Sequence, residues 1–446
     1  MHGAARDDVL LYWGAHPSIA RPDHPAIPAG TPTMPRRLKV GIGLQGNARL
    51  LFAMMFLSEL GFGLYYQNLL TVYMEGIGTT PSQIGAIITG TGLVRIALML
   101  PAGSLVDRMP RRRIVIAATS LAIPGALTYA FATTWWHLVV AGLFMACQQL
   151  GFPALSGIIA DSSENRLDAF RKIYTIAPAS AFIIGPMTSG LIADLVSQRA
   201  VFMVAAVVFS GSWLLAWRIQ EPPAHAHAVR RGSYREVLAH PALRSLYGFK
   251  LVAIAALTLG TTLLPNLLKD AHGLDQRTLG YLFSIAAVGS LIMSTVIGRH
   301  RRLNSIRGIA IGLLSVAVIC WVGQLTGSVF LLGPAFLMRG GFMITWSLFT
   351  PLLSDVAPKA IQERSFAAGE FIASTGNTAA PLAAGVMYEA NRNLPFAVAG
   401  VMLPFLALYA LRLERVVIRP AIAREERLRD DGAVPGPAAT LAAEAA

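Results

Sequence analysis

Four ionisable side chains lie within long apolar stretches of the sequence, namely Glu59, Arg95, Arg339 and Glu370. Glu59 lies ten residues after Arg49, and Arg95 lies twelve residues before Asp107. On helices, both would therefore lie about 15–18 Å from the ends of their stretches. A charge at that depth normally faces a cavity or an opposite charge. A buried carboxylate can take up and release a proton or bind a cationic ligand.

Aromatic and polar residues share the predicted helical face of Glu59. On a 3.6-residue period this face carries Phe52, Phe56, Gly63, Tyr66 and Gln67, which suits an organic ligand. Similar residues occur in three other apolar stretches: Gln148; then Thr258, Thr262 and Asn266; then Phe342, Met343 and Trp346 beside Arg339. A structural ion pair is the alternative for the buried charges, and ordinary helix packing is the alternative for each aromatic residue. Glu370 lies close enough to the end of its stretch to reach the surface.

Several other kinds of chemistry have no support in the sequence. Gly41, Gly43 and Gly46 match a dinucleotide-binding pattern, but an apolar stretch follows them in place of a βαβ unit. A phosphate-binding lysine loop is absent, all nine His lie in tails, loops or helix ends, and the two Cys are far apart. No nucleophile–base or two-acid set occurs at one depth, so we expect no enzyme, no cofactor and no metal site.

The elements that carry these residues are predicted to be membrane-spanning helices. Of the 446 residues, 54% are hydrophobic and only 14% are charged, against about 25% charged in soluble domains. A bilayer crossing takes about 20 apolar residues. Twelve stretches reach or approach this length: 50–73, 84–105, 114–132, 138–160, 172–195, 200–217, 246–268, 278–298, 308–326, 329–354, 366–388 and 394–411. They leave no polar face for water, so we expect an all-α membrane protein with twelve spans.

The basic residues lie mostly on one side of the predicted membrane. With the N-terminus in the cytoplasm, 29 of the 37 Lys and Arg fall on the cytoplasmic side and four on the other. Lys250 is counted with the central cytoplasmic loop. The split places both termini in the cytoplasm. It also accounts for the net charge of +13 without a nucleic-acid partner.

The spans divide into two sets of six. We predict a disordered tail over 1–47, a six-helix bundle over 48–219, a cytoplasmic loop over 220–245, a second six-helix bundle over 246–415 and a disordered tail over 416–446. An offset near 195 residues relates the bundles: Gly85 to Gly280, Gly103 to Gly298, Asp161 to Asp355, Pro186 to Pro381 and Gly190 to Gly385. Parallel repeats of this kind are related by a pseudo-two-fold axis along the membrane normal.

The segment between the second and third predicted helices carries a motif. It follows the pattern Gly-x-x-x-Asp-basic-x-Gly-x-basic-basic through Gly103, Asp107, Arg108, Arg112 and Arg113. Pro110 replaces the second Gly. Over residues 48–415 the sequence therefore resembles the major facilitator superfamily of secondary transporters, whose fold is two six-helix bundles. The resemblance implies that Asp107, with Arg108 and Arg112 nearby, locks the cytoplasmic gate; topological anchoring by the arginines is the alternative.

Two further segments bear on the direction of transport. Gly185, Pro186 and Gly190 resemble the Gly-Pro-x-x-Gly-Gly element of antiporters in this superfamily, with Ser189 in place of one Gly. Close helix packing by small residues is the alternative. Drug/proton antiporters of the superfamily usually carry an Arg in the fourth helix, whereas residues 138–160 contain no basic residue.

The resemblance implies a secondary active transporter that works by alternating access. We expect a monomer in the bacterial inner membrane that exports a small amphipathic organic compound, with a proton as the coupling ion. Uptake symport of a small solute and a non-transporting receptor or scaffold are the alternatives. The expected substrate and coupling residues are Glu59, Tyr66, Gln67, Gln148, Asn266, Arg339 and Trp346, with Arg95 and Glu370 as further candidates.

Overall fold

The computed structural model describes residues 44, 46–162, 166–221, 234–299, 305–358 and 361–423. All regular structure within these ranges is helical. The described residues all belong to one compact unit. Most of the two tails predicted at 1–47 and 416–446, and part of the loop predicted at 220–245, lie outside the described residues.

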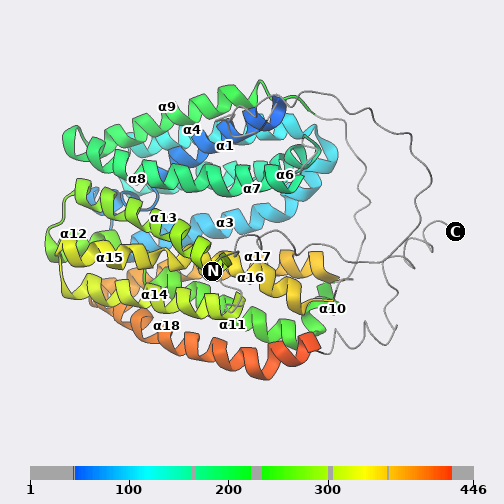
Figure 1. Cartoon of the computed structure of the whole chain (residues 1–446). Helices are drawn as coiled ribbons and strands as arrows, with labels where there is room; N and C mark the ends of the chain where they lie inside the picture. Colours follow the sequence, from blue (N-terminus) through cyan, green and yellow to red (C-terminus); the bar gives the residue numbers. More distant parts are fainter. Residues whose placement is uncertain are drawn as a thin grey trace, which may run out of the picture. The chain divides into compact units, whose positions relative to one another are not determined.

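The first half of the chain, as we use the term, comprises the helices from α1 to α9. They are α1 (Gly46–Gly63), α2 (Leu70–Gly76), α3 (Pro81–Arg108), α4 (Arg111–Ala130), α5 (Trp135–Gln148), α6 (Gly151–Asp161), α7 (Arg166–Arg171), the π-helix η1 (Lys172–Ile176), α8 (Ala177–Leu195) and α9 (Gln198–Ala216). In Figure 1 they occupy the upper part of the ribbon and run roughly alongside one another.

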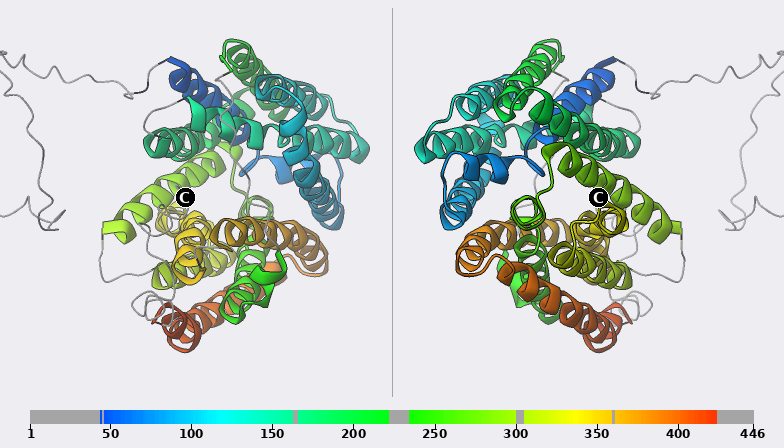
Figure 2. Two further views of the ribbon diagram at one scale, coloured as in Figure 1. Left: turned by 90° about the vertical axis from the view of Figure 1, so that its right-hand side faces the viewer. Right: turned by 90° about the vertical axis from the view of Figure 1, so that its left-hand side faces the viewer.

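The second half comprises the helices from α10 onward. They are α10 (Tyr234–Ala239), α11 (Pro241–Leu259), α12 (Leu264–His272), α13 (Gln276–Arg299), α14 (Ser305–Leu325), α15 (Val329–Arg339), α16 (Gly341–Val356), α17 (Gln362–Ala390), α18 (Leu394–Leu413) and the π-helix η3 (Glu414–Ile418). Figure 2 shows both halves from their two ends, as two groups of helices that meet along α3, α8, α13 and α17.

Ten helical segments of the described chain are long and apolar enough to cross a membrane. They are Pro81–Met99, Arg111–Ala130, Trp135–Asp161, Asp168–Leu195, Gln198–Ala216, Pro241–His272, Gln276–Ile297, Ser305–Leu325, Val329–Val356 and Leu394–Ala423. The other two predicted spans, 50–73 and 366–388, are helical but are not among these ten segments. The first is interrupted between α1 and α2, and α17 is rich in Ala, Gly, Ser and Thr. The count of twelve spans stays a prediction.

Four of the long helical segments are interrupted, two in each half. The interruptions separate α1 from α2, α5 from α6, α11 from α12 and α15 from α16. At the second of these, the amides of Gln149 and Leu150 bond three residues back, to Ala146 and Cys147, and so form a tighter turn. Pro153 follows and has no N–H to bond the carbonyl of Gln149. Interruptions of this kind occur in the middle of membrane segments where transporters bind their ligands.

The two halves cross at two places that the 195-residue offset relates to one another. A Cβ on Gly85 would lie 2.3 Å from the carbonyl oxygen of Pro381, and a Cβ on Gly280 would lie 2.3 Å from that of Pro186. Only glycine allows such an approach of α3 to α17 and of α13 to α8. Helix packing is thus an observed role of the element around Pro186, and Gly190 packs directly against Gly280.

Hydroxyl groups cross between the halves beside the same two prolines. The Thr89 hydroxyl donates to the carbonyl of Thr378 and accepts from the amide of Leu382, at 2.8 and 3.1 Å. At the equivalent place the Ser284 hydroxyl accepts from the amide of Met187 at 3.0 Å. Each hydroxyl accepts a hydrogen bond from the backbone amide of the residue after a proline, where the proline interrupts the helical hydrogen bonds.

Candidate functional site

A cavity of about 200 Å³, here the Glu59 cavity, lies among α1, α3, α4, α5, α6 and α8. Its charged and polar lining residues are Ser58, Glu59, Arg95, Thr119, Gln148 and Gln149. Its aromatic lining residues are Phe62, Tyr66, Phe152 and Phe182. Four of the residues predicted from the sequence, Glu59, Tyr66, Arg95 and Gln148, therefore line one cavity.

A smaller cavity of about 90 Å³, here the junction cavity, adjoins it. Phe62, Tyr66, Arg95 and Gln149 line both cavities, so the two are neighbours that share part of their lining. Asn377 and Thr378 of α17 complete the lining of the junction cavity. The junction cavity therefore lies where the first half meets the second half, whereas the Glu59 cavity is lined by the first half alone.

Within the described residues, the charged side chains of Glu59 and Arg95 form no hydrogen bond and no ion pair with another residue. Three further polar atoms near the cavities are buried without a hydrogen-bond partner in the described chain: Tyr65 Oη, Gln148 Oε1 and Thr378 Oγ1. Buried polar groups are normally satisfied, and each one left without a partner is costly. A ligand that supplied matching groups would remove this cost.

The interruptions in the helices position these side chains. Tyr66 lies in the turn between α1 and α2, and Gln149 lies between α5 and α6. The first interruption is anchored by aromatic packing, because the Tyr65 and Tyr73 rings lie 5.3 and 4.6 Å from the Phe202 ring. On the other side of Glu59, η1 carries Tyr174, whose hydroxyl lies 2.8 Å from that of Ser156.

The other five predicted residues, Glu370 among them, lie outside both cavity linings. Gln67 is half-buried in the turn beside Tyr66. Asn266 is buried and donates to Thr71 O and Glu75 Oε2, at 3.2 and 2.9 Å. The Arg339 guanidinium lies 4.6 Å from the centre of the Phe283 ring, and its Nε has no partner in the described chain. Trp346 packs partly buried against the core.

Glu370 forms an ion pair that the sequence does not predict. Its Oε1 lies 3.1 Å from Nζ of Lys250, whose side chain is only 1% exposed, whereas that of Glu370 is 43% exposed. The placement of Lys250 in the cytoplasmic loop was wrong, because α11 begins at Pro241 and includes it. Lys250 already falls within the span predicted at 246–268, and an acid on α17 compensates its buried charge. The asymmetry of the remaining basic residues is unaffected.

The motif segment lies at the junction of α3 and α4. Gly103 and Asp107 fall in α3, but their surroundings lie outside what the structure describes. Arg108 is exposed, and Arg112 donates to the carbonyl of Trp217 at 2.6 Å. The gating role of Asp107 stays a prediction.

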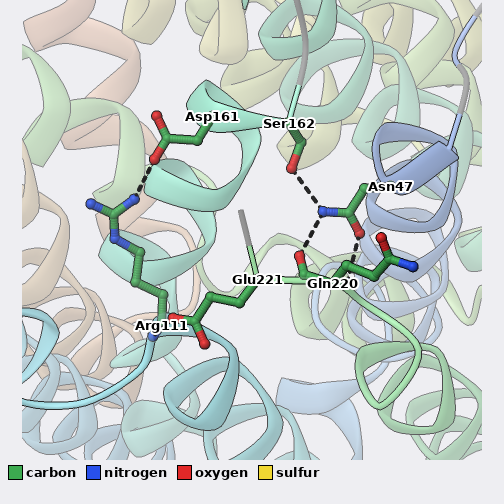
Figure 3. Close-up of polar contacts among 6 residues, drawn as sticks. All are labelled: Asn47, Arg111, Asp161, Ser162, Gln220 and Glu221. Carbon is green, nitrogen blue, oxygen red and sulfur yellow. Dashed lines mark hydrogen bonds and ion pairs between the residues drawn. The ribbon is translucent and has the colours of Figure 1, made fainter. Parts of the chain in front are cut away.

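Arg111 and Asn47 hold this end of the first half together (Figure 3). Arg111 Nη1 lies 2.7 Å from Asp161 Oδ2, and the Arg111 amide donates to Glu221. Asn47 donates to Ser162 and to the carbonyl of Gln220, and it accepts from the Gln220 amide. These bonds link α1, α4, α6 and the segment after α9. Sequence reasoning missed Asn47, since no spacing rule distinguishes it from an ordinary helix start.

The opposite end of the bundle carries polar contacts between the halves. Lys269 pairs with Glu75 at 3.6 Å, and Arg277 pairs with Asp194 at 2.8 Å. Glu389 accepts from the amide of Ser82 at 3.2 Å. Together with the two glycine crossings, these contacts hold the halves together at the end where α3 and α13 begin and α8 and α17 end.

A helical membrane protein with an internal repeat and a charged cavity beside the junction of its halves has the organisation of a secondary transporter. The family model for the Major Facilitator Superfamily matches residues 51–381 and 251–442. The chain belongs to this superfamily, and it is an integral multi-pass membrane protein.

Individual relatives are distant. The inner membrane transport protein YajR of Escherichia coli is 25% identical over 307 residues, which span 65% of this chain and 64% of YajR. The quinolone resistance protein NorA of Staphylococcus aureus is 28% identical over 163 residues, 35% of this chain and 41% of NorA. Among solved structures, a variant of the nucleoside transporter NupG superposes with a TM-score of 0.70 at 12% identity, covering 83% of this chain and 99% of that one. This last likeness concerns the fold alone.

Proposed function

We propose that this protein exports small amphipathic organic compounds across a bacterial cytoplasmic membrane in exchange for protons. Both termini lie in the cytoplasm, and the substrate binds in the Glu59 cavity. The protein alternates between states that open this cavity to either side of the membrane, with Glu59 as the coupling carboxylate and Asp107 as part of the cytoplasmic gate.

The observation that carries the proposal is the Glu59 carboxylate, which lines a partly aromatic cavity and has no recorded partner in the described chain. A proton and a cationic group would compete for this one carboxylate, so release of either would accompany binding of the other. The ion pairs between the halves lie at the end that the proposed topology assigns to the outside, and this supports a state open toward the cytoplasm. The similarity to NorA over part of the chain favours export.

Glu59→Gln tests the coupling role, because glutamine mimics the protonated acid. The full chain is reconstituted in proteoliposomes and tested on a panel of quinolones and lipophilic aromatic cations. A gradient of about one pH unit can drive about tenfold accumulation per proton exchanged. We expect Glu59→Gln to lose this accumulation and to bind the substrate more weakly, because the cationic group loses its carboxylate, while exchange of labelled for unlabelled substrate persists within about twofold at saturating substrate.

Glu236→Gln is the matched control, since Glu236 is an exposed acid on α10. Accumulation by Glu59→Gln equal to that of the wild type would remove the carboxylate from coupling. Accumulation with the proton gradient, rather than against it, would indicate uptake by symport. Binding without any exchange would favour the non-transporting receptor.

A further inference from the structure

The two adjoining cavities contain one acid and one base. Among all residues that line them, Glu59 and Arg95 are the only members of the Asp, Glu, Lys and Arg classes. They come from different helices, α1 and α3, and are not ion-paired with each other. A ligand with one charge would compensate one of them and leave the other in an apolar surrounding.

Arg95 lines both the Glu59 cavity and the junction cavity. Its guanidinium carries five N–H donors in a planar fork, which matches the two oxygens of a carboxylate, and no acceptor is recorded for it in the described chain. The adjoining Thr378 and Tyr65 hydroxyls have no partners there either and can donate to an anion. The anionic end of a ligand is therefore best satisfied toward the junction cavity.

Glu59 lies only in the wider cavity, so the cationic end of a ligand belongs there. Phe62 and Tyr66 line both cavities and hence border the space between the two charged positions. Aromatic rings offer a flat apolar surface and an attractive face to a cation. An aromatic body between two charged ends satisfies all of these features together.

We propose that the site selects aromatic zwitterions, which place a cationic amine at Glu59 and a carboxylate at Arg95. This inference rests on the proposed function and specifies its substrate class. It assigns to Arg95 the recognition of the anionic group, a role separate from proton coupling at Glu59.

The test uses two aromatic zwitterions in three charge forms each. Tryptophan is compared with its methyl ester, which is a cation, and with N-acetyltryptophan, which is an anion. The quinolone norfloxacin is compared with its ethyl ester and its N-acetyl derivative in the same way. Binding to the full chain in lipid nanodiscs is measured by calorimetry at neutral pH, and exchange is measured in proteoliposomes.

For the wild type, we expect at least one zwitterion to bind about 10- to 100-fold more tightly than both of its single-charge derivatives. Arg95→Gln should abolish the preference over the ester, and Glu59→Gln should abolish the preference over the N-acetyl form. Arg244→Gln is the matched control because Arg244 is exposed on α11, and the preference should persist. Comparing ligands within one variant makes the result independent of the folded fraction; Arg95→Lys provides a conservative check.

Equal binding of a zwitterion and its ester to the wild type would overturn the inference, as would the failure of both zwitterions to bind. A preference for a zwitterion over its ester that survives Arg95→Gln would also overturn the inference. Exchange of the esters without any charge preference would refute the zwitterion and leave the proposed transport intact. Charge-selective binding with no exchange of any compound would refute transport and leave the ligand class intact.

Discussion

Two buried charges of the chain have different surroundings. The Lys250 ammonium is paired with Glu370 and lies 5.3 Å from the centre of the Phe349 ring. Glu59 lines a cavity and has no recorded partner in the described ranges. A buried charge with a partner is part of the structure, whereas a charge that faces a cavity is available to a ligand or a proton.

The Lys250–Glu370 pair predicts an asymmetric loss of stability. Glu370→Gln leaves an ammonium that is almost fully buried without compensation, and it should lower the free energy of unfolding by roughly 2 kcal/mol or more. Lys250→Met removes the buried charge and leaves a carboxylate that is 43% exposed, so it should cost less than about 1 kcal/mol. Thermal unfolding in detergent measures both.

The double variant provides the control for this pair. Once Lys250 is methionine, adding Glu370→Gln should have little further effect, because the charge that needed compensation is gone. Equal losses from the two single substitutions would contradict the asymmetry and indicate that both charges are equally well solvated.

At the scale of elements, α13 begins with a carboxylate that caps it. Asp275 directly precedes Gln276, the first residue of α13, and its Oδ1 accepts a hydrogen bond from the amide of Thr278 at 2.9 Å. Hydrogen bonds from Thr278, first from its side chain and then from its amide, hold the pKa of Asp275 below its ordinary value. A lowered carboxyl pKa contributes stability above the pKa of the unfolded chain, and this contribution is lost as the pH falls through the folded-state value.

Asp275→Ala should therefore destabilise the protein by about 1 kcal/mol at neutral pH, as loss of a helix cap does. Asp275→Asn should cost only a few tenths, since asparagine caps almost as well. The difference in unfolding temperature between wild type and Asp275→Ala should shrink as the pH falls through the acid range. A difference that is constant from neutral to acid pH would show that the ionised carboxylate makes no contribution.

The sequence predicts helices better than it predicts their interruptions. Apolar length suffices to locate a membrane helix, so α14 and α18 were predicted within a few residues. The turn around Tyr66 depends on packing of distant rings against Phe202, which composition does not encode. For the same reason, the sequence indicates the depths of Glu59 and Arg95, but the rotation of α1 and α3 decides that they face one cavity.

At the scale of the whole molecule, the basic residues predict the orientation in the membrane. After Cys147 and Cys320 are replaced by Ser, single cysteines are introduced at Gly76, Asn391 and Arg231. A membrane-impermeant thiol reagent added outside intact cells should label the first two, which are exposed at the end where the halves are in contact. Arg231, which lies outside the described residues, should stay unlabelled until the cells are opened. Labelling from outside of the cysteine introduced at Arg231 would contradict the predicted orientation in the membrane.

The reciprocal crossings at Gly85 and Gly280 also bear on kinetics. Each crossing joins one helix of the first half to one of the second, and both lie at the same end of the bundle. Separating that end requires the α3–α17 and α8–α13 contacts to break within one event, because either alone still holds the halves in register. The free energy needed to separate both crossings therefore contributes to one barrier. A state in which only one crossing is open does not yet separate the halves. We therefore expect the two crossings to open together, as one cooperative step at this end of the bundle.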